Sequence, residues 1–309
     1  MKLGLTMPNM GPLADQQTLV VIADSAEALG YESIWVSDHV LVPNALPVDV
    51  FGRVLESMTT LAYLAAHTER IGLGTGVLVL PQRDPVLVAK QAATLDHFSA
   101  GRLSLAVAVG WLEQEYRFLR SDFHTRGVRA YEYVEVLRKL LDEQSPRHTG
   151  PEIHFSDAYF APRPSRRLPI LLGGSSEAAL RRAATIGDGW YGWKQTPDEA
   201  AAAVEALRGL GAPDSFDVSV RARAKVGDDL SEGAAMTTIG GGARSVAGQI
   251  DAYRRSGVDR LVIDPVAATL DDFLTQIGRL ADFMDEPARV DGSVSRFNRL
   301  SDTDSDSTV

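Results

Sequence analysis

Short apolar runs and longer stretches of helical periodicity alternate along the chain about eight times, without an obvious linker between two halves. The apolar runs are rich in Val, Ile and Leu at successive positions, a pattern typical of strands buried on both faces of a parallel sheet. The predicted strands are Leu3–Met7, Ser33–Val36, Ile71–Leu80, Leu103–Val109, Ile170–Leu172, Gly189–Gly192, Val218–Val226 and Arg260–Ile263.

The stretches between these strands predict helices with well-marked ends. Asp84 before Pro85 and Thr196 before Pro197 are typical of helix starts, because a side-chain oxygen caps free amides there and proline lacks the amide that would need a partner. Gly30 is typical of a helix end. The predicted helices are Gln16–Leu29, Val54–Thr68, Val86–Phe98, Val128–Leu141, Glu177–Ile186, Pro197–Leu210, Ala243–Ser256 and Leu270–Phe283.

Repeated strand–helix units indicate an α/β fold, a (β/α)8 TIM barrel formed by a single domain over residues 1–285. Two segments rich in proline or glycine, residues 144–168 and 227–242, are too long for simple connections. We expect them to be insertion loops at the C-terminal face of the strands, where they would shape a pocket. Residues 286–309 are too polar to form a core and are expected to be a disordered tail without a catalytic role.

The composition is that of a soluble globular protein, with 45% hydrophobic and 23% charged residues among 309. The 31 basic and 41 acidic residues give a formal net charge of −10, which disfavours nucleic acid and anionic membranes as partners. The absence of cysteine excludes disulfides, thiolate-bound metals and a cysteine nucleophile. The sequence has no apolar run of membrane-spanning length and no signal-peptide pattern, so a cytoplasmic enzyme is expected.

The third predicted strand carries glycine at three alternate positions, Gly72, Gly74 and Gly76. Glycine weakens a strand, because it loses more backbone entropy on folding and offers no side chain for packing. The repeat therefore indicates a ligand, a bulge or a close backbone approach, although a small-residue strand beneath a helix would have the same pattern. It is not the dinucleotide-binding fingerprint, since these glycines lie within a strand.

In a (β/α)8 barrel the reaction site lies at the carboxyl ends of the strands, so the residues that follow each strand are the candidates. His39 follows the second strand beside Asp38, where an imidazole could stabilise developing charge; a structural histidine is the alternative. Asn9 follows the first strand and Gly110 the fourth. The other histidines lack metal-ligand spacing, so no metal is expected.

The segment Gly173-Gly174-Ser175-Ser176 joins the fifth predicted strand to a helix. Free amides and hydroxyls at such a junction can bind a phosphate, although an ordinary turn with a serine cap has the same sequence. The chain has no Walker motif and no Gly-x-Ser-x-Gly elbow, so nucleotide hydrolysis and serine hydrolysis lack the residues they need.

Three tryptophans, Trp111, Trp190 and Trp193, fall at the ends of predicted strands. Large rings around the barrel mouth would suit a planar ligand, and packing beneath the insertions would explain them equally well. Glu113 and Glu115 could form a pair of carboxylates, but acidic residues are also frequent at helix starts.

In their order along the chain, these motifs resemble the luciferase-like monooxygenase family over roughly residues 1–285. The resemblance implies a (β/α)8 barrel that binds either reduced FMN or the deazaflavin coenzyme F420, with the ring resting on the third strand. A non-proline cis peptide occurs in that strand in relatives. The matching motifs are Ser37-Asp38-His39, Gly74–Pro81, Pro85–Lys90, Leu95-Asp96, Ser99–Trp111, Arg126, Gly173-Gly174 and Gly187–Trp190, and the cis bond is expected at Gly76-Val77.

The Asp38-His39 pair resembles the F420 branch, in which this histidine lies near the reacting edge of the ring during hydride transfer. The same resemblance implies that the serine-rich turn after the fifth strand binds the cofactor phosphate. Residues after the sixth strand match phosphate or tail contacts of that branch less closely. Together with the strand-end positions above, it yields catalytic residues His39 and Asp38, cofactor contacts Gly76, Val77, Gly110, Gly173, Gly174, Ser175, Ser176, Lys194 and Thr196, and a substrate pocket of Asn9, Trp111, Trp190 and Trp193.

One position departs from the family pattern. Relatives that oxidise sugars or alcohols carry a glutamate directly after the glycine of the fourth strand, whereas this chain has Trp111. An indole cannot shuttle a proton, so sugar or simple alcohol oxidation is disfavoured and His39 remains the expected acid–base residue.

The resulting hypothesis is an F420-dependent oxidoreductase that moves hydride between the deazaflavin and an uncharged, fairly apolar small molecule. One alternative is a two-component FMN-dependent monooxygenase, for which a reductase would be the partner that supplies reduced flavin. Another is a non-catalytic barrel subunit. A homodimer is expected from the family and from the general frequency of such dimers.

Overall fold

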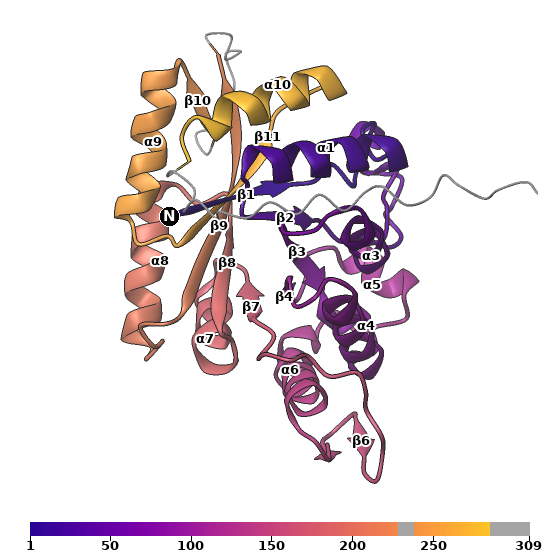
Figure 1. Ribbon diagram of the computed structural model, residues 1–309. Helices are drawn as coiled ribbons and strands as arrows, with labels where there is room; N and C mark the ends of the chain where they lie inside the picture. The colour runs from indigo at the N-terminus through magenta and orange to yellow at the C-terminus, as the bar shows by residue number, and fades with distance from the viewer. Residues whose placement is uncertain (228–237, 285–309) are drawn as a thin grey trace, which may run out of the picture.

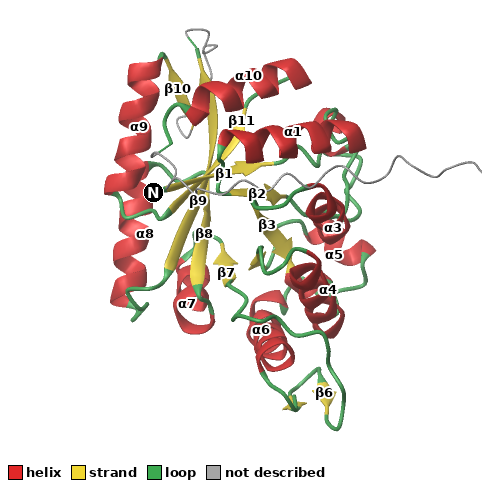
Figure 2. Ribbon diagram, viewed as in Figure 1, coloured by secondary structure: helices red, strands yellow, loops and turns green. Residues whose placement is uncertain are grey.

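The structure is a computed structural model that describes residues 1–227 and 238–284. In these residues, parallel strands form a closed barrel surrounded by helices, which confirms the predicted architecture (Figures 1 and 2). The barrel strands are β1 (Lys2–Thr6), β2 (Ser33–Val36), β3 (Gly72–Val79), β4 (Leu103–Ala108), β7 (Ile170–Gly173), β8 (Gly189–Trp193), β9 (Asp217–Val226) and β11 (Arg260–Pro265).

The barrel closes because β8 pairs with β9 in parallel, from Gly189 opposite Asp217 to Trp193 opposite Arg221. Around the barrel, neighbouring strands follow the order β9, β11, β1, β2, β3, β4, β7 and β8. All of these pairings are parallel, so the carboxyl ends of the strands meet at one face of the barrel. That face is called the barrel mouth below.

The outer helices begin where the sequence marks their caps. Asp84 accepts hydrogen bonds from the amides of Val86 and Leu87, and Thr196 forms a reciprocal capping box with Glu199. Such caps satisfy amides that have no partner within the helix. The helices are α1 (Gln16–Leu29), α3 (Ser57–His67), α4 (Pro85–Phe98), α6 (Arg126–Asp142), α7 (Glu177–Ile186), α8 (Pro197–Gly209), α9 (Ala243–Arg255) and α10 (Leu270–Ala281).

Several short elements were not predicted, because none is long enough to show a period in the sequence. Three of them, the short helices after β2, β3 and β4, follow the carboxyl ends of barrel strands at the mouth. The short elements are α2 (Val48–Phe51), η1 (Leu80–Gln82), α5 (Glu113–Phe118), β5 (His148–Thr149), β6 (His154–Phe155) and β10 (Thr238–Gly241).

Both faces of the barrel sheet are buried, which accounts for its continuous apolar runs. The larger core fills the layer between strands and helices. A smaller cluster fills the barrel interior and consists of Trp35, Ala106, Leu171, Tyr191 and Val262, all at most 2% exposed. None of the described helices has both the length and the apolar run needed to cross a lipid bilayer.

The two predicted insertions differ in how they connect. Residues 144–168 lead from α6 to β7, so this segment starts and ends at the side opposite the mouth. Its β5–β6 hairpin folds back along the outside of α6, where the Glu132 carboxylate accepts from the amides of Glu152 and Ile153 (Figure 1). The second insertion follows β9 at the mouth, and its strand β10 pairs with the end of β9. Residues 228–237 and the predicted tail 286–309 lie outside the described residues.

Candidate active site at the barrel mouth

A bulge in β3 lies at the mouth. The β3–β4 pairing shifts register between Thr75 and Leu78, which leaves Gly76 and Val77 outside the regular ladder. The Gly76-Val77 peptide bond is cis, as the family resemblance implied. Val77 is partly exposed, and a Cβ on Gly173 would lie 2.9 Å from its Cγ1. The bulge therefore exposes backbone and the small apolar side chain of Val77 at the mouth. Strand β7 has glycine close to it, because a methyl group at Gly173 would collide with Val77.

Tyr191, in the barrel interior, lies directly beneath the bulge. A Cβ on Gly76 would lie only 2.5 Å from the Tyr191 hydroxyl oxygen, which explains why this position needs glycine. Tyr191 packs on Trp35 with 5.2 Å between ring centroids, and burial raises the pKa of its phenol far above the ordinary value. No described residue is a hydrogen-bond partner of this hydroxyl. The floor of the bulge thus holds a neutral phenol whose donor is unused.

His39 lies at the mouth after β2 and is held by an acidic residue. Its Nδ1 lies 2.9 Å from Glu115 Oε2, and its ring meets Phe51 and Trp111 edge-on at centroid distances of 5.3 and 6.3 Å. The side chain is 11% exposed. No hydrogen bond from a described residue reaches Nε2, so this nitrogen is the one available to a bound molecule.

Glu115, from α5, is 1% exposed and fully hydrogen-bonded. Its Oε1 accepts from the amides of Val40 and Leu41 at 2.6 and 3.2 Å. Burial alone would raise the pKa of Glu115, but the hydrogen bonds from His39 and from these amides outweigh burial and lower the pKa. The carboxylate is therefore ionised near neutral pH and fixes a proton on His39 Nδ1. The sequence offered a pair with Glu113 instead, whereas Glu113 binds Arg117 on the surface.

Asp38 is buried beside this pair and organises the surrounding backbone. Its Oδ1 accepts from Ser57 Oγ at 3.0 Å and from Arg83 Nη2 at 2.7 Å, and its Oδ2 accepts from the Val79 amide at 2.9 Å. Arg83 also pairs with Glu56 at 3.0 Å. The side chain of Asp38 is 0% exposed, so it joins β2, β3 and α3 without reaching solvent.

Arg221, at the end of the β8–β9 pairing, connects the bulge to the His39 loop. Its Nη1 donates to Ser37 Oγ at 2.8 Å and lies 3.4 Å from the Gly76 carbonyl oxygen, while Nη2 donates to Asp264 at 2.9 Å. The guanidinium also stacks 4.5 Å from the centre of the Trp193 ring. These partners could not be predicted, because a charged residue near a strand end shows no partner in the sequence.

The predicted phosphate turn follows β7 at the mouth. Gly174 adopts φ +118, a conformation that favours glycine, and Ser176 caps α7 by accepting from the amide of Ala179 at 3.2 Å. Ser175 is exposed. The turn therefore combines a helix N-terminus with one committed and one free hydroxyl, which is a fitting arrangement for an anion.

The two predicted contacts after β8 differ in availability. The hydroxyl and amide of Thr196 are both used in the capping box of α8, so Thr196 has a structural task already. Lys194 is exposed, with its ammonium 5.1 Å from the centre of the Trp193 ring. Gly110 follows β4 with φ +66, and a Cβ there would lie 2.7 Å from Val79 Cγ1.

The four predicted pocket residues are not all at the mouth. Trp111 and Trp193 are 61% and 42% exposed. Trp190 is 0% exposed in the layer beneath the helices, and its indole donates to the Gly174 carbonyl at 2.7 Å. Its placement in the substrate pocket was wrong, because alternate residues of a strand face opposite sides and Trp190 faces outward. Asn9 is 1% exposed and uses its amide to join Ser37 and Leu55.

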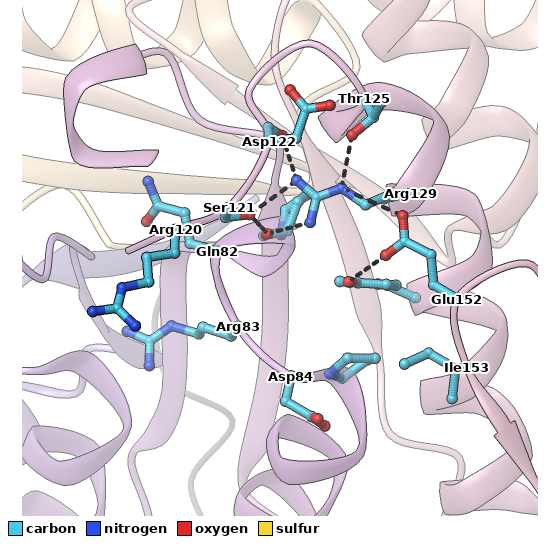
Figure 3. A pocket seen from close by; sticks show the side chains of 13 residues that line it. Gln82, Arg83, Asp84, Arg120, Ser121, Asp122, Thr125, Arg129, Glu152 and Ile153 are labelled. Carbon is cyan, nitrogen blue, oxygen red and sulfur yellow. Dashed lines mark hydrogen bonds and ion pairs between the residues drawn. The ribbon is translucent and has the colours of Figure 1, made fainter. Parts of the chain in front are cut away.

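A cavity of about 480 Å³ lies outside the barrel, between η1, the start of α4, the first turn of α6 and the hairpin tip (Figure 3). Arg129 crosses it and donates to the Pro81 carbonyl, Ser121 Oγ and Thr125 Oγ1. Glu152 on the far wall accepts from Tyr133. These charged groups are satisfied by the protein, so this cavity does not take the place of the mouth as the candidate site.

Comparison with known proteins agrees with the family resemblance of the sequence motifs. The model of the family described as luciferase-like monooxygenase matches residues 4–232. The uncharacterized protein Rv0940c of Mycobacterium tuberculosis is 32% identical over 199 residues, which are 60% of this chain and 69% of the relative.

Two solved structures share the fold over nearly their whole length. Monooxygenase RslO1 from Streptomyces bottropensis has a TM-score of 0.79 at 19% identity and covers 92% of this chain and 98% of its own. An F420-dependent secondary alcohol dehydrogenase, solved with an F420-acetone adduct, has a TM-score of 0.77 at 16% identity, with coverages of 92% and 99%.

Proposed function

Because the chain belongs to the luciferase-like monooxygenase family, we propose that it is an F420-dependent oxidoreductase. It would transfer hydride between the deazaflavin and an uncharged, fairly apolar organic molecule. The observation that carries this proposal is the His39 imidazole at the mouth, oriented by the buried, ionised Glu115 and leaving Nε2 open.

The residues at the mouth fit a planar coenzyme that carries a phosphate. The Gly76–Val77 bulge would support the ring, because its backbone is free of the ladder and a small side chain covers it. The Tyr191 hydroxyl below lacks a described partner. The turn Gly173–Ser176 would hold the phosphate at the N-terminus of α7. When bound, the reduced coenzyme supplies the hydride.

His39 would manage the proton that accompanies hydride transfer. With Nδ1–H donated to Glu115, the neutral ring has an acceptor at Nε2, and the imidazolium has a donor there. The Glu115 carboxylate holds the ring in one orientation, so His39 would take a proton from a substrate hydroxyl or give one to a substrate carbonyl at Nε2. Asp38 would act as a positioning residue, since its carboxylate is used by Arg83, Ser57 and Val79.

The rim of the mouth favours an apolar substrate. Trp111 and Trp193 expose large rings, and Val40 and Leu41, next to His39, are 45% and 53% exposed. Apolar side chains at a site entrance recognise apolar surface and help to exclude water from the reacting atoms. Substrate choice would therefore depend on shape and hydrophobicity more than on charge.

Support for the F420 assignment comes from the Asp38-His39 pair and from the fold shared with the F420-dependent alcohol dehydrogenase. The second candidate is a two-component FMN monooxygenase, which would take reduced flavin from a partner reductase. It is favoured by the equally close fold of monooxygenase RslO1. Both candidates would use the same bulge and phosphate turn, so a measurement of which cofactor binds decides between them.

A fluorescence titration of the purified protein with F420 and with FMN, each oxidised and reduced, tests the choice. We expect F420 to bind at least about tenfold more tightly than FMN, a difference of about 1.4 kcal/mol. Tight binding of reduced FMN alone, with oxygen consumption that depends on an added reductase, would establish the monooxygenase instead. Binding of neither cofactor would support the non-catalytic subunit.

A further inference from the structure

Arg182 on α7 is a buried cation without a visible counter-charge. It is 9% exposed, and no hydrogen bond or ion pair joins it to any described residue. Its neighbour Arg181 is exposed and pairs with Glu177 at 2.7 Å. A buried guanidinium normally has a carboxylate or carbonyl partner, because desolvating an unpaired charge is costly. No nitrogen of Arg182 is among the described side-chain atoms that are both fully buried and unpartnered, so its donors remain accessible to solvent and to a small anion.

The surroundings of Arg182 are positive as well. Its Nη1 lies 3.5 Å from the position that a Cβ would take on Gly127, in the first turn of α6. Arg126 begins this helix. Its Nη1 donates to the Phe123 carbonyl at 2.6 Å, whereas its buried Nε has no described hydrogen-bond partner. The Thr125 hydroxyl does not cap α6, because it accepts from Arg129 Nε at 3.1 Å instead. Two guanidinium groups thus lie beside an uncapped helix N-terminus, which carries partial positive charge.

The lowered pKa of Arg182 agrees with its positive surroundings. Burial lowers the pKa of Arg182; Tyr131 opposes this shift, while Arg126 adds to it. Of these contributions, the one from Arg126 reflects a second positive charge near Arg182. An oxyanion placed between the two arginines would reverse the repulsion and satisfy the free N–H groups at once.

We propose that Arg182 and Arg126 form an anion-binding subsite between the first turn of α6 and α7. The subsite rests on the proposed function in its choice of ligand, a phosphate or carboxylate group of the cofactor. α6 packs against α7 and both helices begin at the mouth, and Arg182 lies six residues along α7 from its cap Ser176, so the subsite is toward the mouth end of these helices. Arg182 leans toward the start of its helix, as helical side chains do, and so toward the same end of the barrel.

Inorganic phosphate tests the subsite without any cofactor. In a thermal unfolding series, saturating phosphate should raise the Tm of the wild-type protein and of Arg181→Met by about 2–4 °C. The Arg182→Met variant should shift by less than about 1 °C. Arg181→Met is the matched control, because it removes the same charge one residue away. Equal shifts in all three proteins, or no shift in any of them, would overturn the proposal.

The same variants reveal whether Arg182 is merely structural. In buffer without phosphate, Arg182→Met should unfold at a temperature equal to or above that of the wild type, since methionine keeps the aliphatic packing and removes an unpaired charge. A clearly lower Tm for Arg182→Met than for Arg181→Met would identify a structural arginine and contradict the subsite.

Cofactor pairs distinguish the two sources of the anion. F420 is compared with its deazaflavin precursor that lacks both phosphate and carboxylate tail, and FMN is compared with riboflavin. Weaker binding of F420 and FMN to Arg182→Met, by about tenfold or more, with the other two unchanged, indicates the phosphate. A loss for F420 alone indicates the carboxylate tail. An equal loss of affinity for all four compounds contradicts the subsite. If the wild type binds none of the four, the proposed function is contradicted, and the subsite is then judged from the thermal shifts with inorganic phosphate alone.

Discussion

The charged groups on the two sides of the barrel mouth differ in how they are partnered. On the side of β2 and β4, every carboxylate oxygen of Asp38 and Glu115 accepts a hydrogen bond from the protein. On the side of α6 and α7, Arg126 and Arg182 keep donors for which no described residue is a partner. The carboxylates of the first side are satisfied by the protein itself, although Arg83 Nε beside them has no described hydrogen-bond partner. The arginines of the second side keep donors that a ligand would use.

This difference follows from what each side has to do. A proton-transferring group is effective only if it is held in one orientation before the substrate arrives, and His39 is held in this way by Glu115. Donors that bind an anion are more useful unpaired, because the free energy lost by leaving them open is recovered when the ligand binds. Substitutions on the first side are therefore expected to change stability or catalysis, and substitutions on the second side to change ligand affinity.

The largest expected effect is the loss of the buried charge on the completed side. Asp38→Asn should lower the free energy of unfolding by about 3–5 kcal/mol, because Arg83 would be left buried without its main counter-charge. Urea unfolding measures this change. Asp24→Asn on the exposed face of α1 is the control and should change stability by no more than about 0.5 kcal/mol. If both variants unfolded alike, the two sides would not differ in the way described.

The next effect concerns chemistry instead of stability. His39→Ala should lower kcat by about 100-fold, since general acid–base catalysis contributes at least that much, with cofactor affinity changed by less than about threefold. Steady-state turnover with a panel of apolar ketones and alcohols, together with cofactor titration, separates the two quantities. His67→Ala on the exposed side of α3 is the control. A loss of cofactor affinity without a loss in kcat would make His39 a binding residue.

A smaller effect depends on pH. The pKa of Glu115 is lowered from its ordinary value of 4.5, so its contribution to stability is present above that pH and is lost as the pH falls through the folded-state value. Glu115→Gln should therefore cost about 1–2 kcal/mol at pH 7 and progressively less below pH 4.5. Urea unfolding across this range gives the comparison, and Glu113→Gln, on the same helix and partly exposed to solvent, should show neither effect. A pH-independent cost would mean that the Glu115 charge is not what holds His39.

The smallest effect lies where the two sides meet. Gly173→Ala would place a Cβ 2.9 Å from Val77 Cγ1 and 3.1 Å from Ala108 Cβ, so the bulge must shift. We expect a stability loss of about 1 kcal/mol and cofactor binding weaker by about tenfold. Gly209→Ala is the control, since its Cβ would meet nothing within 4 Å. Unchanged cofactor binding would indicate that the cofactor ring does not rest on the bulge.

The barrel could be predicted from the sequence because its evidence is local and repeated. Strands buried on both faces read as apolar runs, and caps such as Asp84 and Thr196 mark where the helices begin. The short helix α5 could not be predicted, because six residues show no period. Glu115 was a candidate carboxylate in the sequence, but its partner could not be identified because His39 lies 76 residues earlier in the chain.

Side-chain direction limited the prediction of the site in other ways. Trp190 and Trp193 both seemed to belong to the mouth, yet strand alternation buries Trp190 under the helices. Arg181 and Arg182 are the same residue type at adjacent positions of one helix, and only packing against α6 makes the second a buried cation. Such distinctions arise from tertiary contacts that a single sequence does not encode locally.

The hairpin-bearing connection between α6 and β7 runs over the outer wall, away from the chemistry. Its Tyr159 is fully exposed, and the chain contains no cysteine. Tyr159→Cys would therefore create the sole thiol of the molecule, to which a fluorophore or a surface tether could be attached while the entrance for substrate stays clear.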